Sequence, residues 1–105
     1  MGVKTLVRNP ERLRRPEEVD DVLYRISIYE RERTCEAGVL LIQRMGFSGL
    51  YEIVSKRGAD EWMSRPVYDD GKGNRTCEWG IKFYPRSYFE ELREKMRTQA
   101  ADDSL

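Results

Sequence analysis

The stretch GVLLIQRMGFSGLYEIVS, residues 38–55, decides how the rest of the chain is interpreted. Its first half is a continuous aliphatic run after Gly38, short enough for a strand that is buried on both faces. Residues 46–49 have the composition of a turn, and residues 50–55 are rich in side chains that favour strands. We therefore predict a β-hairpin with strands at 39–45 and 50–56.

Two further strands are predicted from alternating apolar and polar residues. Tyr24, Ile26 and Ile28 alternate with polar neighbours, which predicts a strand at 24–29 after a short helical segment that begins near Pro16. The same alternation predicts a strand at 77–84, in which Trp79 faces the core.

A capping box at 87–90 predicts a helix at 87–98, and 58–74 is expected to be a long irregular loop. These elements indicate an α+β fold built on a small open or closed barrel of mixed strands.

The length and composition indicate how many domains the chain forms and which partners it is expected to bind. A chain of 105 residues suits one domain, which we place at 1–99 with a disordered tail at 100–105. Nineteen basic and nineteen acidic residues give zero net charge, so attraction to a polyanion would need a local patch. The sequence lacks a secretory signal and a membrane-spanning run, which favours a cytoplasmic protein that does not enter a membrane.

Catalysis is not expected from this set of residues. Histidine is absent, which removes the commonest general base and the commonest zinc ligand. Asp69 and Asp70 fit ordinary turn composition better than a metal loop, so we predict no metal, no cofactor and no enzyme activity. Cys35 and Cys77 are far apart in the sequence and are predicted to be free thiols.

Two groups of residues are candidates for binding. The first is a basic cluster near the start of the chain, which could hold phosphates or could form a solvated face. It consists of Lys4, Arg8, Arg12, Arg14 and Arg15. The second is the pair Trp62 and Tyr68 in the predicted loop, with Phe47 in the predicted turn. Such rings are candidate stacking platforms, although Trp62 could equally anchor its own loop.

The order of these segments resembles an EVE domain, a member of the PUA-like superfamily. The resemblance rests on TLVRNPE at 5–11, EAGVLLI at 36–42, SGLYEIVS at 48–55, PVYD at 66–69 and EWGIKF at 78–83. Two features depart from the family pattern. Val39 stands where the family usually has Asp, and 16–35 contains no Trp.

This resemblance implies a small mixed-strand PUA-like β-barrel with peripheral helices. It also implies a non-catalytic reader of nucleic acid, with an aromatic-walled pocket for a modified or flipped base. Trp62, Tyr68 and Tyr24 would then be in the pocket walls. Charge alone suggests Arg12, Arg14 and Arg15 for phosphate contacts.

A small protein-binding module is the alternative interpretation. Such an inhibitor or adaptor, of the kind that mobile elements encode, would use the predicted loop at 58–74. Trp62, Met63 and Tyr68 would contact the protein partner, because Trp and Tyr are typical interface anchors. Zero net charge favours this alternative over a nucleic-acid partner.

Overall fold

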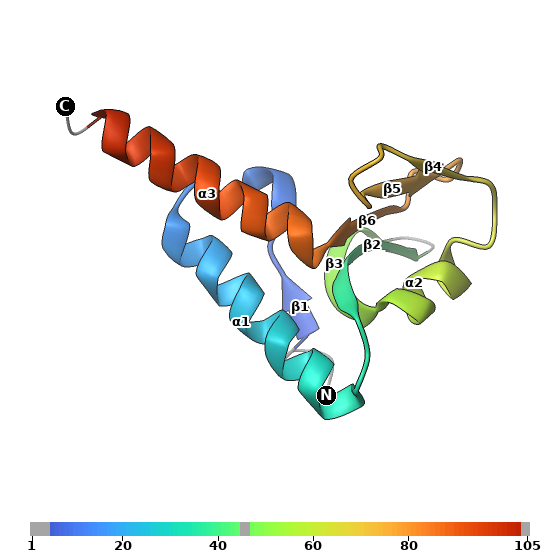
Figure 1. Cartoon of the computed structure of the whole chain (residues 1–105). Helices are drawn as coiled ribbons and strands as arrows, with labels where there is room; N and C mark the ends of the chain where they lie inside the picture. Colours follow the sequence, from blue (N-terminus) through green and yellow to red (C-terminus); the bar gives the residue numbers. More distant parts are fainter. Residues whose placement is uncertain (1–4, 45–46, 104–105) are drawn as a thin grey trace.

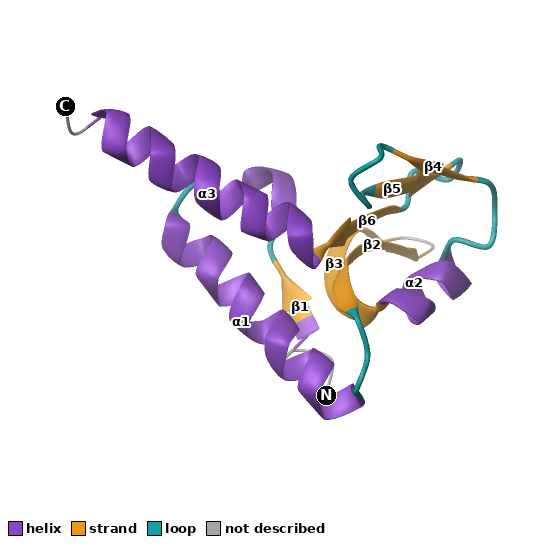
Figure 2. Cartoon of the chain, in the orientation of Figure 1, coloured by secondary structure: helices purple, strands orange, loops and turns teal. Residues whose placement is uncertain are grey.

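The computed structural model describes residues 5–44 and 47–103, and its elements are labelled in Figure 1 and coloured by type in Figure 2. The helical elements are the 3-10 turn η2 (Pro10–Arg12) and the helices α1 (Pro16–Arg33), α2 (Lys56–Trp62) and α3 (Arg86–Asp103). The strands are β1 (Leu6–Val7), β2 (Ala37–Arg44), β3 (Phe47–Ser55), β4 (Val67–Asp69), β5 (Arg75–Cys77) and β6 (Lys82–Pro85).

The described strands form one six-stranded sheet in the order β1-β3-β2-β6-β5-β4, with every neighbouring pair antiparallel. The predicted hairpin is confirmed as β2 and β3, which are paired from Ala37–Ser55 to Arg44–Phe47. Phe47 therefore begins a strand rather than lying in a turn. The fold is α+β as predicted, but a closed barrel is not confirmed, because in the described chain β1 and β4 are the edges of an open sheet.

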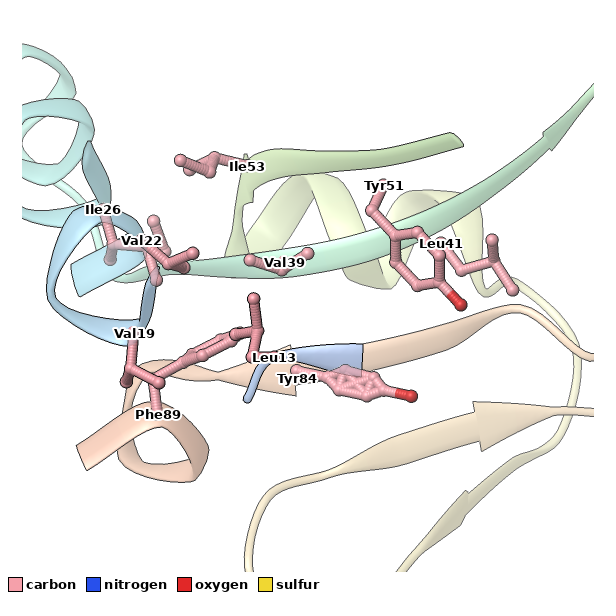
Figure 3. Packing of buried hydrophobic residues seen from close by; sticks show 11 residues of the cluster. Leu13, Val19, Val22, Ile26, Val39, Leu41, Tyr51, Ile53, Tyr84 and Phe89 are labelled. Carbon is pink, nitrogen blue, oxygen red and sulfur yellow. The ribbon is translucent and has the colours of Figure 1, made fainter. Parts of the chain in front are cut away.

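Alternate side chains of the sheet are buried on opposite faces. On one face, α1 and α3 cover a cluster that includes Val39, Leu41, Tyr51, Ile53 and Tyr84, with Val19, Val22 and Ile26 from α1 and Phe89 from α3 (Figure 3). On the other face, Ala59 and Met63 of the α2 segment pack on Leu40, Ile42, Cys77, Ile81 and Phe83. The aliphatic run at 39–42 is thus buried on both faces, as predicted.

The predicted strand at 24–29 is wrong, because these residues belong to α1. Val19, Val22 and Ile26 follow helical spacing and are buried together. Ile28 is only half-buried and Tyr24 is exposed. The apparent alternation therefore arises from residues on different sides of a helix.

Three other boundaries differ from the predictions. The strand at 77–84 is interrupted by a turn, in which the Gly80 N–H donates to the Cys77 carbonyl at 2.9 Å. The supposed loop at 58–74 contains most of α2 and all of β4, and Ser55 caps α2 by accepting the Gly58 N–H at 2.9 Å. Finally, α3 continues to Asp103, so 100–103 is helical rather than a disordered tail; residues 104–105 lie outside the described range.

Gly38 permits the closest approach between the two halves of the sheet. It pairs with Pro85 of β6, and a Cβ atom at this position would lie 2.4 Å from the Tyr84 carbonyl oxygen and 2.6 Å from the Phe83 ring. Only glycine fits between these groups. The ladder from β2 to β6, which joins β4, β5 and β6 to the rest of the sheet, therefore depends on it.

Candidate functional site

The structure does not bring the three predicted pocket aromatics together. Tyr24 is 64% exposed on α1, Tyr68 is 64% exposed in β4, and Trp62 is 37% exposed at the end of α2. Tyr68 pairs with Thr76, on the face that carries α1 and α3, whereas α2 and Trp62 lie on the opposite face. Next to Trp62, Met63 is buried in the core, so it is Met63 that anchors this segment.

Four pockets of the described chain are lined by other residues. A groove of about 640 Å³ lies between β1 and the first half of α1, and includes Leu6, Leu13 and Val22. A second groove, of about 490 Å³, continues along α1 past Ile28 and Tyr29. Two more pockets lie near α3 and β6. Across the described residues, none of these four is lined by Trp62, Tyr68 or Tyr24.

Two arginine side chains of the basic cluster bind other groups of the chain, whereas two others form no ion pair among the described residues. Arg8 pairs with Glu18 at 3.0 Å, and Arg14 donates to the carbonyl oxygens of Glu11 at 3.0 Å and Leu13 at 3.2 Å. Arg12 and Arg15 are exposed, and within residues 5–44 and 47–103 their side chains form no ion pair. Lys4 lies outside the described residues.

Glu18 organises the backbone of this cluster. Its Oε1 accepts the backbone N–H groups of Arg14 at 3.1 Å and Arg15 at 3.0 Å, which are the first causes of its lowered pKa. Glu18 is the third residue of α1, so its side chain reaches back to the start of the helix. The cluster is therefore held by helix capping as well as by ion pairs.

Several exposed apolar side chains instead lie in the segment from the end of α2 to the β5–β6 turn. We define the β4 surface as Trp62, Arg65, Val67, Tyr68 and Trp79. Its aromatic members come from the end of α2, from β4 and from the β5–β6 turn, and Trp79 is 50% exposed. The prediction that Trp79 faces the core is therefore wrong; in its place Ile81, after the turn, is buried.

Arg65 contacts Trp79, another member of the β4 surface. Its guanidinium lies 5.0 Å from the centre of the Trp79 ring, and its Nη1 lies 3.5 Å from the Glu78 carboxylate. Val67 pairs with Cys77 immediately before the β5–β6 turn, so the turn and the start of β4 are at the same end of the sheet. Arg65, Val67 and Trp79 thus lie at the same end of the sheet, and Arg65 holds the Trp79 ring by a cation–π contact.

The backbone of β4 has free hydrogen-bonding capacity at the sheet edge. The Asp70 N–H donates to the Asn74 carbonyl at 3.2 Å, one step beyond the Asp69–Arg75 pair. Hydrogen-bonded and non-bonded pairs alternate in an antiparallel ladder, so Tyr68 is the β4 residue that bonds to β5. The N–H and C=O groups of Val67 and Asp69 consequently point away from the sheet.

A small polar pocket of about 200 Å³ was not anticipated from the sequence. Tyr84 and Tyr88 line it, with ring centres 4.9 Å apart, as do Glu11 and Lys82, which pair at 3.6 Å. The Tyr84 hydroxyl is buried and has no hydrogen-bond partner among the described residues. Burial first, and then Glu11, raises the pKa of Tyr84.

Among the described residues, no three side chains of His, Cys, Asp or Glu gather in a way that could hold a metal ion. None of the described helices combines the length and the apolar character needed to cross a bilayer. Cys77 is buried and Cys35 half-buried, each as a free thiol.

Comparison with family models, curated proteins and solved structures finds no match to this chain.

Proposed function

We propose that this protein is a binding module for another protein, which it contacts through the β4 surface. One observation carries the proposal. Trp62, Tyr68 and Trp79 are all exposed, at the end of α2, in the edge strand β4 and in the β5–β6 turn, and exposed Val67 lies between Trp62 and Tyr68 in the sequence. Trp and Tyr are the residues most enriched at energetic centres of protein interfaces, and grouped exposed apolar side chains mark interaction sites.

The charge of this region favours a protein over a nucleic acid. Residues 60–79 contain five acidic and three basic residues, so the segment is negative overall. A phosphate backbone would be repelled by this charge. A protein partner can bury the aromatic rings and leave the charged groups at the wet rim of the interface.

A modified-base reader, as implied by the resemblance to EVE domains, is the second candidate. The observation in its favour is that Arg12 and Arg15 are exposed and form no ion pair within the described chain, which suits phosphate contacts. Trp62 and Tyr68 lie on opposite faces of the sheet, so a base would stack on one ring rather than between two. A PUA-like barrel would require the sheet to close.

The test is a selection of peptides from a random display library, followed by affinity measurements on purified variants. Trp62→Ala and Trp79→Ala should each weaken the selected ligands about 30-fold, equivalent to the ~2 kcal/mol of an interface hot spot. Tyr24→Ala is the matched control, because Tyr24 is as exposed as Tyr68 but lies on α1. Equal binding by all three variants would refute the proposal.

The reader is tested in parallel by fluorescence anisotropy. Modified and unmodified oligonucleotides, single- and double-stranded, are titrated across a salt series. Binding that falls in the Arg12→Ala/Arg15→Ala double variant, with a salt slope smaller by about 2, would favour the reader. Arg14 is left unchanged because its side chain supports the backbone of the turn before α1.

A further inference from the structure

We propose that two copies of this chain pair through β4, antiparallel and centred on Tyr68, so that two six-stranded sheets become one continuous sheet. This inference rests on the proposed function, since it names a second copy as an occupant of the β4 surface. It is carried by the backbone of the strand and by the register that this backbone imposes.

The backbone groups are self-complementary. Val67 and Asp69 each present an N–H and a C=O away from β5, as shown above. When Val67 is placed opposite the partner's Asp69, both residues exchange two hydrogen bonds, and the two-fold axis repeats this pair. A shift of the register in either direction leaves one of the two pairs unmade, so the alignment is unique.

The same register brings the two copies of Tyr68 face to face. Tyr68 would occupy the non-hydrogen-bonded position on the axis, where opposite Cα atoms are about 4.5 Å apart and side chains are closest. Aromatic pairs stabilise such positions. Tyr68 is 64% exposed in the single chain, so each ring gains a neighbour without displacing one.

The charges at the ends of β4 do not oppose this pairing. Arg65 precedes the strand, whereas Asp69 and Asp70 end it. In the proposed register Arg65 lies opposite the partner's Gly71, and Asp70 lies opposite the partner's Pro66, so neither end places two like charges directly opposite each other. The chain has zero net charge, so two copies do not repel each other as whole molecules.

Pro66 does not oppose this pairing. By the same alternation its backbone faces β5 rather than the open edge, so its missing N–H removes no bond from the dimer. The short length of β4, three residues, limits the contact to four backbone hydrogen bonds. The dimer should therefore be weak and reversible.

The test is sedimentation velocity on the full chain from about 5 to about 500 µM, a range that covers weak interfaces. The mass should rise with concentration from 12.4 kDa towards twice that value. Val67→Pro removes one outward N–H and should shift the midpoint at least tenfold to higher concentration. Val67→Ala keeps that N–H and is the matched control, with a midpoint close to that of the unmodified chain.

A second measurement identifies the strand. In a Cys35→Ser background, Tyr68→Cys should form a disulfide-linked dimer under mild oxidation, because cysteines at this position meet across the axis. Tyr24→Cys should not. A chain that stays monomeric at every concentration overturns the inference but leaves peptide binding to the β4 surface intact. A dimer unaffected by Val67→Pro also overturns it.

Discussion

Replacement of Gly38 by Ala tests the close contact between β2 and β6, which connects the two halves of the sheet. The added Cβ would lie 2.4 Å from the Tyr84 carbonyl oxygen, about 1 Å inside an ordinary van der Waals contact. That oxygen belongs to the backbone of β6, so β6 must move away from β2. Such a shift would stretch the ladder between Val39 and Tyr84.

The size of the effect follows from two opposing contributions. Loss of one or two net hydrogen bonds at ~1 kcal/mol each, together with the misfit at the Phe83 ring, should cost about 2–4 kcal/mol. The lower backbone entropy of alanine in the unfolded chain returns up to about 1 kcal/mol. We therefore expect Gly38→Ala to lower the free energy of unfolding by about 1–4 kcal/mol.

Urea denaturation followed by tryptophan fluorescence measures this change. Gly58→Ala is the matched control, because its Cβ would meet only the Ser55 hydroxyl, at 3.0 Å, and alanine favours α2. Its stability should stay within about 1 kcal/mol of the unmodified chain. Equal or greater stability of Gly38→Ala would refute the argument from close approach.

Two predictions concern pH. Because the pKa of Glu18 is lowered in the folded state, its carboxylate stabilises the fold at pH values above its unfolded pKa of 4.5, and this stabilisation is lost as the pH falls through the folded pKa. Glu18→Gln should therefore flatten the fall of stability at acid pH. Glu17→Gln should not. The raised pKa of Tyr84 means that the folded state holds this proton more tightly, so stability should fall as the pH rises above about 10. Tyr84→Phe should flatten that alkaline limb in urea denaturation, with Tyr24→Phe as the control.

The central hairpin could be predicted because its signals agree with one another. The run at 39–42 is aliphatic and flanked by a glycine, and its partner at 50–55 has the same strand preference. Burial on both faces of the sheet then selects this segment as the centre. A segment can be predicted from sequence alone when its local preference and its tertiary burial favour the same structure.

The predicted strand at 24–29 is wrong because the apolar residues there fit both the strand period of two and the helical period. Tyr24, Ile26 and Ile28 satisfy period two, but Val19, Val22 and Ile26 satisfy the helical period over a longer window. A window extended back to residue 19 would have favoured the helix. The burial of Ile26 beside Val22 is the tertiary contact that decides between the two.

The candidate site could be predicted only in part from the sequence. Trp62 and Tyr68 are exposed, but they lie in α2 and β4 rather than in the predicted loop, and Trp79 is exposed rather than in the core. Gly80 has φ of +78°, a turn conformation that ends the alternation and turns Trp79 outwards. The polar pocket at Tyr84 is lined by residues of η2, β6 and α3. These segments are distant in the sequence, so no local sequence pattern predicts that they meet.

The two edges of the open sheet are unequal, and this sets a limit on assembly. β1 is two residues long and β4 is three, and they lie at opposite ends of the strand order. A contact between β4 and β1 of the next copy would leave the same two edges exposed at the ends, so it would add chains without limit and produce a fibre. Pairing of β4 with itself consumes the longer edge in both chains, and leaves only the two-residue edges to solvent. A symmetric partner at β4 would thus act as a terminator of sheet growth.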